Sequence, residues 1–402
     1  MNYKKYIFLI TFTILTSVSI FFLIYSKVAY PTIWPVIKDN TLILFHDWSY
    51  VVNSSLCFER GYDVYLNNPC EKFSTRFIYG KIILYLPFVE NNMKLYGLII
   101  PIIINLIFIF ICLSFFYVEG KYLYQILSII FIFSIPFLLV IERANIDILI
   151  AVFIFLIAKF KNVYLNIFFI VLTSLSKFYP ICLNIIFLFN KNLKNFFKNV
   201  LITNMIIFSF LFFQKESLIK IFQNKSLVTV SSVSTYNFSF SGIVQSLTNM
   251  NGFIVFFYLL ILLFFIFIFM KKILSNIEKF DLINSDIYEN RLFLLSLTVL
   301  IFCYFIFSNY IYREIFFFGL IPWLLKNNNN SNNNLPTLLL SLICFKFIIN
   351  FLIVFIYVNN IIPIFNLVLV FFKNFIDFVI IFPLTIIMLI SFYYFFRTKF
   401  IS

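Results

Sequence analysis

The stretch LYGLIIPIIINLIFIFICLSFFY, residues Leu95–Tyr117, contains no charged side chain. A helix that crosses a bilayer needs about 20 consecutive apolar residues, because lipid offers the backbone no hydrogen-bonding partner. Similar apolar runs recur along the chain. Hydrophobic residues make up 63% of the sequence and Phe alone occurs 62 times, which is more apolar surface than a soluble fold of 402 residues can bury. The sequence therefore predicts an all-α polytopic membrane protein.

These runs predict about 10–13 transmembrane helices. Several runs are shorter than a full span, as expected where helices break or tilt around a buried polar site. The region 360–373 fits an interfacial helix as well as a span. The predicted spans are Tyr6–Tyr25, Leu95–Tyr117, Tyr122–Ile141, Ile146–Phe160, Tyr164–Ser176, Pro180–Phe189, Leu201–Phe213, Phe253–Met270, Leu292–Phe307, Ile315–Leu325, Leu338–Val358 and Phe375–Phe396.

Basic residues set the predicted orientation of the spans. Lys4 and Lys5 precede the first run, and the cytoplasmic ends of membrane helices carry an excess of Lys and Arg. We therefore expect a cytoplasmic N-terminus in a multi-pass protein of a bacterial inner membrane, built as one membrane domain over 1–402. Alternation places the first loop, 26–94, and a later loop, 214–251, on the extracytoplasmic side, and the Asn-rich linker 326–334 in the cytoplasm.

Charge and composition also argue against several function classes. The net charge is +14, but the basic residues lie at the ends of apolar runs rather than in one groove, so no nucleic-acid partner is expected. A single His and the lack of any C-x-x-C spacing argue against a metal site. With only 7 Gly, the chain has little room for a phosphate-binding glycine loop. We expect no cofactor.

The first loop gathers ionisable side chains in a chain of which only 11% is charged. It includes the single His, in His46-Asp47-Trp48-Ser49-Tyr50. Asp47 follows the apolar run 42–45 with only His46 between them. We therefore expect Asp47 at the edge of a membrane-seated helix, in a partly dehydrated place that suits a catalytic base. A solvated loop carboxylate is the alternative.

Two cysteines of the same loop, Cys57 and Cys70, flank the turn at Gly61. They could form a disulfide if the loop faces an oxidising compartment, and sequence alone leaves this open, because the loop geometry is unknown. Asp63 follows Gly61, where a side-chain hydrogen bond within the turn is the expected role. The other four cysteines lie in apolar runs and are expected to be packing residues.

A second polar segment, Glu142-Arg143-Ala144-Asn145-Ile146-Asp147, joins two predicted spans. Asp147 in the first turn favours the helix dipole, and Arg143 is spaced to pair with it. Fixing a helix end and contacting a ligand are equally good explanations of such a pair. We expect the segment on the same side as the first loop.

Two further cations are candidate phosphate ligands. Lys177 lies between apolar stretches without an acidic neighbour in sequence, so its ammonium group would bind an anion such as phosphate. Snorkelling of the side chain to the interface is the alternative. Arg313 stands beside Glu314, with Tyr310 and Tyr312 adding hydroxyl and ring surface suited to a sugar. An interfacial aromatic belt with an anchoring Arg is the alternative there.

Two groups of motifs resemble the GT-C superfamily of polytopic glycosyltransferases, specifically glycosyltransferase family 87, whose members use polyprenol-phosphate mannose. The first is Asp47-Trp48-Ser49-Tyr50 with Gly61-Tyr62-Asp63-Val64-Tyr65 and Tyr79-Gly80-Lys81. The second is Arg143-Ala144-Asn145-Ile146-Asp147 with Lys177-Phe178-Tyr179-Pro180. Asn309–Arg313 is similar to a late loop of the family. The resemblance covers the first half of the chain well and the second half thinly.

The resemblance implies a GT-C-like fold with a catalytic first loop, and transfer of a hexose, in this family mannose, from a polyprenyl-phosphate donor to a lipid or glycan acceptor. Transfer would invert the anomeric carbon on the extracytoplasmic face, without a metal. Asp47 would be the base. The implied donor-phosphate ligands are Lys177, Arg313 and Arg143. The implied substrate contacts are His46, Tyr50, Arg60, Asp63, Tyr65, Asn145, Asp147, Tyr179 and Tyr312.

Two other classes compete with a transferase. A transporter or flippase of lipid-linked saccharide would need a cationic cavity through the membrane, whereas the cations not assigned to cytoplasmic anchoring gather on one predicted side. A polysaccharide polymerase or ligase would share the polytopic build and a large extracytoplasmic loop. The informative loop here is the first one, and the later loop 214–251 is rich in Ser and Asn without an evident catalytic set.

Overall fold

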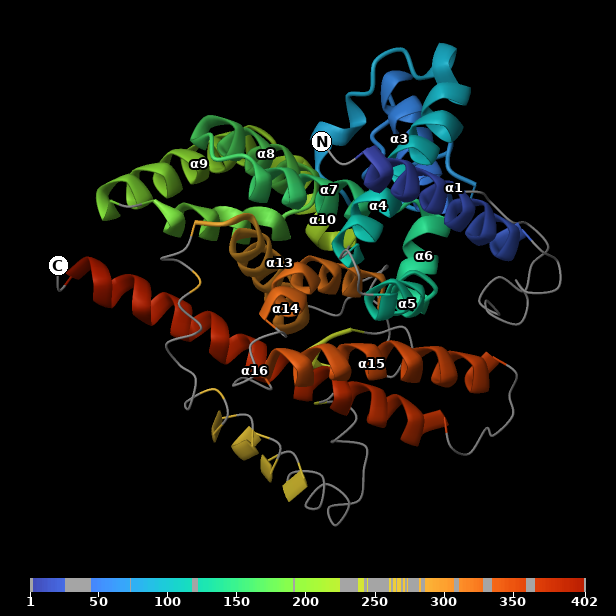
Figure 1. The fold of residues 1–402 in the computed structure, drawn as a ribbon. Helices are drawn as coiled ribbons and strands as arrows, with labels where there is room; N and C mark the ends of the chain where they lie inside the picture. Colours follow the sequence, from blue (N-terminus) through green and yellow to red (C-terminus); the bar gives the residue numbers. More distant parts are fainter. Residues whose placement is uncertain are drawn as a thin grey trace. The chain divides into compact units, whose positions relative to one another are not determined.

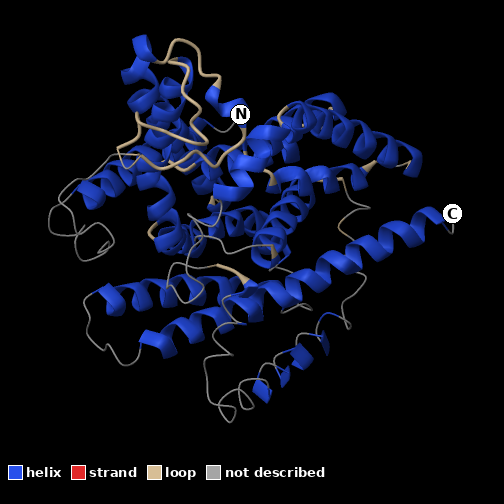
Figure 2. Ribbon diagram, turned by 180° about the vertical axis from the view of Figure 1, so that it is seen from behind, coloured by secondary structure: helices blue, strands red, loops and turns tan. Residues whose placement is uncertain are grey.

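The computed structural model describes residues 3–25, 45–72, 74–117, 122–190, 192–224, 286–306, 311–327, 335–358 and 366–400, with scattered positions between 238 and 282. Every regular element whose bounds are given below is a helix (Figure 1, Figure 2). The α-helices are α1 (Tyr3–Tyr25), α3 (His46–Glu59), α4 (Ile100–Phe116), α5 (Tyr122–Ile132), α6 (Ile135–Arg143), α7 (Ile146–Lys159), α8 (Val163–Ser176), α9 (Leu193–Phe213), α10 (Lys215–Asn224), α13 (Tyr288–Phe305), α14 (Ile321–Asn327), α15 (Leu335–Val358) and α16 (Asn366–Phe400). The 3₁₀ helices are η1 (Lys81–Leu84), η2 (Glu90–Asn92), η4 (Tyr179–Phe189) and η7 (Ile311–Leu320), and η3 (Leu95–Ile99) is a π-helix.

Among the described residues, five helical segments are long and apolar enough to cross a membrane, or six if a pair of helices bent by 56° counts as one span. The helical class and the membrane character predicted from sequence are therefore confirmed, while the described residues do not reach the predicted count of about 10–13 spans. Helices α7 and α8 have 14 residues each, or about 21 Å, against a hydrocarbon core of about 30 Å. The five segments are Leu95–Phe116, Leu193–Phe213, Tyr288–Phe305, Leu335–Ile353 and Leu369–Arg397, and the bent pair is Tyr124–Ile132 with Ile135–Arg143.

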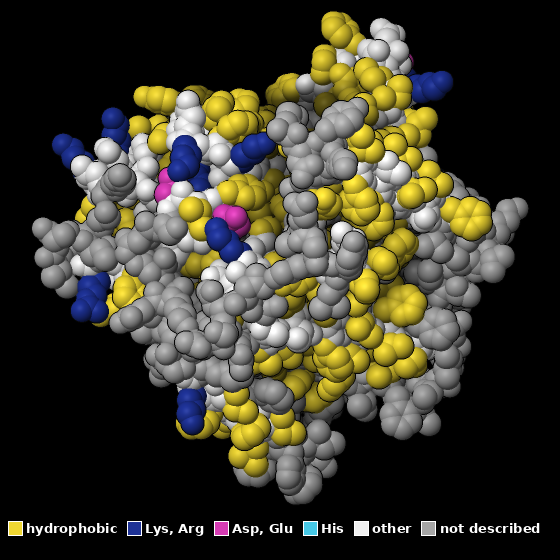
Figure 3. Space-filling view, in the orientation of Figure 1, with side chains coloured by type: hydrophobic (Ala, Val, Ile, Leu, Met, Phe, Trp, Pro, Cys, Tyr) yellow, Lys and Arg dark blue, Asp and Glu magenta, His cyan; other side chains and the backbone are white. Residues whose placement is uncertain are grey.

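Helix α9 shows the polarity expected of a helix in lipid. Its buried residues are Asn199, Thr203 and Ile207, whereas Met205 and Phe212 are exposed. A water-soluble helix has the reverse pattern, with apolar residues inside. Hydrophobic side chains also cover much of the described surface in Figure 3, where Lys and Arg are few and scattered. This apolar surface is therefore the kind expected of a protein in contact with lipid.

The chain forms two compact units, each made of segments distant in sequence. Unit 1 consists of Met1–Asn40, Phe110–Leu138 and Val230–Ser402. In this unit α13 packs on η7, and α15 packs along α16 (Figure 1). Rings fill its interior: Phe131 lies 5.4 Å from Phe318 and 5.0 Å from Phe347, measured between centroids. The helices of the second half of the chain thus pack on one another and on α5.

Unit 2 consists of Thr41–Ile109 and Leu139–Thr229. Here α3 packs against η1 and η3, while α8 packs against α7, α9, η1 and η4. The contact of η1 with α8 depends on Gly80, because a Cβ built there would lie 1.7 Å from the carbonyl oxygen of Leu175. The amide of Gly80 donates to the carbonyl of Ser176 at 3.0 Å. The segment before η1 is therefore pressed onto the end of α8, next to Lys177.

Some predicted segments fall largely outside the described residues. These are the first part of the 26–94 loop, most of the 214–251 loop, most of the linker 326–334 and much of the predicted span at 253–270. Asn309 and Tyr310 of the late polar segment lie outside them too. The predictions made for these residues stay predictions.

Candidate functional site

Asp47 lies in the first turn of α3, in unit 2. The helix begins at His46, directly after Phe45, which is fully buried and has a left-handed backbone with φ of 54°. Trp48, which follows Asp47, donates its indole N–H to the carbonyl of Tyr96 at 2.7 Å. Buried rings on both sides thus fix the start of α3, and with it the position of the Asp47 carboxylate.

The Asp47 carboxylate receives a hydrogen bond on each oxygen from the segment between α6 and α7. Arg143 Nη1 donates to Oδ1 at 3.1 Å, and Asn145 Nδ2 donates to Oδ2 at 2.5 Å. Asn145 also caps α7, because its Oδ1 accepts the backbone N–H of Asp147 at 3.0 Å. The Asn145 side chain thus caps α7 with its oxygen and binds the Asp47 carboxylate with its nitrogen.

A second layer of polar residues stands behind Asn145. Lys177 Nζ donates to Asn145 Oδ1 at 2.9 Å and to Asp147 Oδ1 at 2.7 Å. The Tyr179 hydroxyl also donates to Asp147 Oδ1 at 2.7 Å. Both residues come from the junction of α8 and η4, where the chain changes from an α-helix to a 3₁₀ helix. Asp147, Lys177 and Asn145 are therefore one buried network that holds the amide facing Asp47.

Backbone strain accompanies both halves of this site. Phe45 and Ala144 have φ of 54° and 44°, and a residue with a Cβ pays about 1–3 kcal/mol for such a conformation. Phe45 immediately precedes His46 and Asp47, and Ala144 stands between the two residues that bind Asp47. Strain of this kind persists where surrounding packing enforces it, and it is concentrated at functional sites.

The exposed fraction of the side chains decreases from the Asp47–Arg143 pair to the Asp147–Lys177 pair. The Asp47 and Arg143 side chains are 14% and 22% exposed, whereas Asp147 is fully buried and Lys177 is 6% exposed. Asp147 is paired with Lys177, so burial of the inner pair does not leave a net charge in the interior. Arg143 is paired with Asp47, and its Nε also lies 3.9 Å from the buried carboxylate of Glu142. Only the outer pair can therefore meet a ligand without rearrangement of the network.

An aromatic cluster lies beside the network, and Tyr79 connects the two. The Lys177 ammonium lies 5.0 Å from the centroid of the Tyr79 ring, within cation–π range. Phe77 joins Tyr50, Tyr65 and Tyr79, at centroid distances of 5.5, 5.7 and 5.7 Å. The Tyr50 hydroxyl donates to the carbonyl of Arg76 at 2.6 Å. Burial raises the pKa of both the Tyr50 and the Tyr65 phenol above the ordinary value, so these rings stay neutral.

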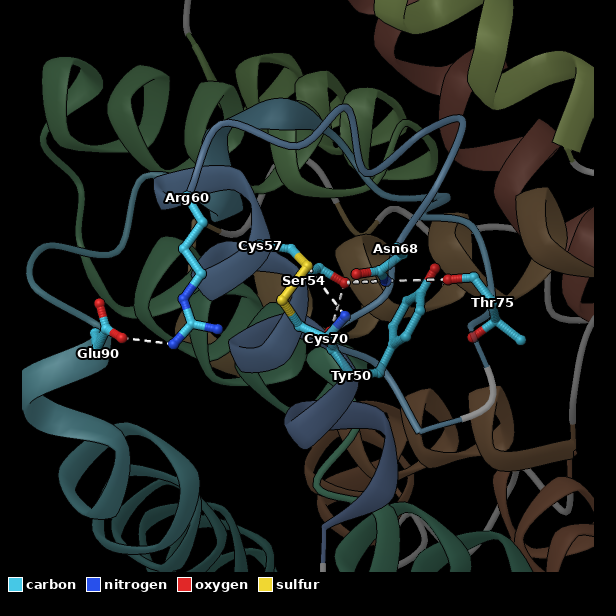
Figure 4. Close-up of a disulfide and its surroundings, with 8 residues drawn as sticks. All are labelled: Tyr50, Ser54, Cys57, Arg60, Asn68, Cys70, Thr75 and Glu90. Carbon is cyan, nitrogen blue, oxygen red and sulfur yellow. Dashed lines mark hydrogen bonds and ion pairs between the residues drawn. A yellow bond between two sulfur atoms is a disulfide. The ribbon is translucent and has the colours of Figure 1, made fainter.

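The disulfide that the sequence left open is present and ties the first loop to α3. Cys57 and Cys70 are bonded, with their Cα atoms 5.6 Å apart (Figure 4). Asn68 supports the same segment by donating to the Ser54 hydroxyl at 2.9 Å and to the carbonyl of Thr75 at 3.0 Å (Figure 4). The segment that leads to Phe77 and Tyr79 is therefore anchored on the helix that carries Asp47.

The single histidine is half-buried next to the carboxylate. Burial lowers the pKa of His46 below its ordinary value, and the neighbouring Asp47 opposes that shift in part. The imidazole is therefore disposed to stay neutral. A neutral ring can donate one hydrogen bond and accept another, so His46 retains the properties expected of a substrate contact.

The structure brings together six of the residues singled out from sequence. Asp47, Arg143, Asn145, Asp147, Lys177 and Tyr179 form the network described above. One expected pair differs: Arg143 was expected to pair with Asp147, but the structure pairs Arg143 with Asp47 and Asp147 with Lys177. The cause is the left-handed turn at Ala144, which places Arg143 and Asp147 on different helices instead of one.

Other predicted contacts lie elsewhere. Arg60 pairs with Glu90 on the surface at 2.5 Å (Figure 4). Asp63 accepts the backbone N–H of Tyr65 at 3.2 Å, the turn role expected from its sequence, and also pairs with Lys220 at 2.6 Å. Tyr312 and Arg313 belong to η7 of unit 1. The assignment of Arg313 to the donor phosphate and of Tyr312 to a substrate contact stays a prediction.

The sequence analysis missed a second group of buried charges, in unit 1. Glu314, Lys346, Lys373 and Asp377 are each at most 1% exposed and form ion pairs. The signal was available, since Lys346 interrupts the apolar run 338–358 and Asp377 the run 375–396, and an ionisable residue inside a span is a functional candidate by default. Among the described residues, no group of three or more His, Cys, Asp or Glu is arranged to hold a metal.

Comparisons with models of known protein families, with curated proteins and with solved structures found no match. The chemistry of the site rests on its own residues. These are a carboxylate with an Arg at a partly exposed position, a buried network that orients the carboxylate through Asn145, and neutral aromatic and imidazole groups nearby. Five helical segments among the described residues are long and apolar enough to cross a bilayer, and these segments indicate a membrane protein.

Proposed function

We propose that the protein is a membrane hexosyltransferase that uses a polyprenyl-phosphate sugar, with Asp47 as the catalytic base. The observation that carries the proposal is the setting of the Asp47 carboxylate. Arg143 and Asn145 fix both of its oxygens, a buried network behind Asn145 fixes that amide, and the outer pair remains partly exposed. A base must be oriented and must reach the proton that it removes.

The proposed reaction is a single displacement at the anomeric carbon. Asp47 takes the proton of an acceptor hydroxyl. The oxygen of that hydroxyl forms the new bond to C1 while the bond from C1 to the phosphate oxygen breaks. The electron pair of that bond leaves with polyprenyl phosphate, and attack from the opposite face inverts C1. The oriented carboxylate supplies the general-base contribution, about 10²–10⁴ in rate.

Arg143 suits the leaving phosphate because of what happens to its partner. Before transfer its guanidinium faces an ionised carboxylate, 3.1 Å away. When Asp47 accepts the proton, that carboxylate becomes neutral, and Arg143 keeps the carboxylate of Glu142, 3.9 Å from its Nε, as an acidic partner. The leaving phosphate gains negative charge at the same moment, and an Arg can bind it with two parallel hydrogen bonds. The negative charge near Arg143 would thus decrease on the Asp47 carboxylate and increase on the leaving phosphate.

The role proposed for Lys177 changes in the light of its contacts. Its ammonium is buried between Asp147 and Asn145 and lies over the Tyr79 ring. A donor phosphate would have to displace Asp147 and leave a buried carboxylate unpaired, at a cost of about 3–5 kcal/mol. We therefore assign Lys177 to positioning Asn145, and the phosphate contact of unit 2 to Arg143.

The test is transfer of labelled hexose from synthetic polyprenyl-phosphate hexoses by the purified full chain in nanodiscs. The proposal expects a labelled product whose anomeric configuration is inverted relative to the donor, formed without added metal. Retention of configuration would contradict the single displacement. Failure with every donor and acceptor offered, with a folded protein, would contradict the transferase itself.

A second candidate, a transporter of lipid-linked saccharide, is favoured by the buried charges of unit 1. Lys346 lies within the candidate span Leu335–Ile353, and Lys373 and Asp377 lie within Leu369–Arg397. Ionisable residues at such places mark ion and proton pathways in membrane proteins. Movement of an unmodified lipid-linked saccharide across proteoliposomes, without glycosyl transfer, would favour this function over the first.

A further inference from the structure

Unit 1 contains a closed cluster of four charges on three elements: Glu314 on η7, Lys346 on α15, and Lys373 and Asp377 on α16. Lys346 Nζ lies 2.8 Å from Glu314 Oε1 and also donates to Asp377 Oδ1. Lys373 Nζ lies 3.1 Å from Asp377 Oδ2 and 3.9 Å from Glu314 Oε1. With two acids and two bases the cluster is neutral, which is how such groups are accommodated inside a bilayer.

The two carboxylates are held unequally. Asp377 has a lysine on each oxygen. Among the described residues, Glu314 has lysines only near Oε1, and its Oε2 accepts a hydrogen bond from the neutral amide of Asn350 at 2.9 Å. A nearby positive charge stabilises an ionised carboxylate more than a neutral donor does. Glu314 is thus the carboxylate whose ionised form receives less support, while its burial is complete.

Asn350 offers a partner for a protonated Glu314. Its amide oxygen is buried and accepts no hydrogen bond from the described residues, while its amide nitrogen donates to Glu314. An amide can present either its N–H or its oxygen to a neighbour by rotating about its last bond. Rotation of Asn350 would therefore replace the bond that it donates to a carboxylate with one that it accepts from a carboxylic acid. Both protonation states of Glu314 have a hydrogen-bonding partner already in place.

Charges from the packed elements do not supply a further partner to Glu314 among the described ion pairs. On α13, which packs on η7, Arg291 pairs with Asp286 at 3.1 Å and Glu289 with Lys326 of α14 at 3.4 Å. Arg313 adjoins Glu314 in η7. The groups that face Glu314 are therefore Lys346 from α15 and Lys373 and Asp377 from α16.

We propose that Glu314 is a proton-binding site within the membrane region of unit 1. A proton from water adds to the ionised carboxylate to give the acid, and Lys346 then keeps only Asp377 as an acidic partner. The ion pair that links η7 to α15 is lost, whereas the hydrogen bond between Glu314 and Asn350 is kept with its direction reversed. The bound ligand is a proton alone, so no other reactant is needed.

Infrared difference spectroscopy of the full chain in nanodiscs tests the proposal, because the C=O stretch of a carboxylic acid is separate from the bands of a carboxylate. Acidification should produce an acid band that shifts when the protein carries glutamate labelled with ¹³C at the side-chain carboxyl. Glu314→Gln should abolish that band, a loss equal to one proton per chain. Glu289→Gln, which removes a glutamate of α13 that is 30% exposed, should leave it unchanged.

A second variant guards against misfolding of Glu314→Gln. Glu314→Asp keeps the carboxylate and the neutrality of the cluster, and it should transfer the isotope sensitivity of the band from labelled glutamate to labelled aspartate. A band that persists in Glu314→Gln would overturn the proposal. So would a band in the unaltered chain that follows labelled aspartate, since this would assign the proton to Asp377, or the absence of any such band.

Discussion

The Asp47 network of unit 2 and the Glu314 cluster of unit 1 both bury acids and bases in pairs, but of these two only the network of unit 2 has an end that reaches the surface. Asp47 and Arg143 are 14% and 22% exposed, whereas each charge of the unit 1 cluster is at most 1% exposed. A network with an open end can present a charged group to a substrate and keep that group oriented. A closed cluster can hold helices together or exchange a proton, but it cannot contact a sugar without opening.

The largest expected effect comes from removing a charge of the closed cluster. Lys346→Met leaves Glu314 and Asp377 buried with one lysine between them, and breaking a buried pair costs about 3–5 kcal/mol. Arg143→Met is the matched change in unit 2, where Asp47 can gain water, so its cost should be smaller. Denaturation in detergent micelles, followed by circular dichroism, gives both values. Equal losses would mean that exposure does not distinguish the two networks.

Arg143→Ala should act mainly on transfer. A charge-assisted hydrogen bond contributes about 1.5–3 kcal/mol, so the rate of hexose transfer at subsaturating donor should fall about 10- to 150-fold. Arg60→Ala serves as the control, because Arg60 forms a surface pair with Glu90 and should change the rate little. If the two variants transferred sugar equally well, the phosphate role of Arg143 would be wrong.

Gly80→Ala tests how unit 2 holds Tyr79 beside Lys177. A Cβ at Gly80 would overlap the Leu175 carbonyl, so η1 or the end of α8 must shift, and overpacking of this kind costs about 1–3 kcal/mol. Gly97→Ala is the control, since a Cβ there meets nothing within 4 Å. Thermal unfolding midpoints should drop for the first variant only. A shift confined to Gly97→Ala would contradict the described contact.

The smallest expected effect is a pH dependence from His46. Burial lowers its pKa in the folded state below the unfolded value of about 6.5. The unfolded chain then binds more protons as pH falls below that value, so the contribution of neutral His46 is present above it and lost progressively below it. His46→Asn should flatten this part of the curve of unfolding free energy against pH. An unchanged curve would show that burial of the imidazole has no energetic consequence.

Sequence reasoning succeeded where a local pattern was sufficient. Apolar runs predicted helices such as α4, α15 and α16, and the search for polar residues at the ends of runs found Asp47, Arg143, Asn145 and Lys177. The pairings could not be predicted in the same way. Arg143 binds Asp47, which is 96 residues away, instead of Asp147 in the same segment, because the tertiary fold and a left-handed Ala144 decide which acid it meets.

The buried cluster of unit 1 shows a different limit. Its lysines and acids can be read from the sequence, in or next to apolar runs. That they neutralise one another is seen only when η7, α15 and α16 are packed together. Gly80 is similar: the sequence gives a glycine, and the need for it appears only when Leu175 is placed against it. Contacts between distant segments thus carry the information that composition and periodicity lack.

The central claim is that Asp47 is the base, and replacing it by Asn tests this most directly. The variant keeps the size of the side chain and one oxygen acceptor but removes basicity. Transfer of labelled hexose should fall about 10²–10⁴-fold, while donor binding and expression stay near those of the unaltered chain. Asp63→Asn and Glu59→Gln, which change other acids of the first loop, should remain active. Transfer by Asp47→Asn at nearly the unaltered rate would contradict the claim.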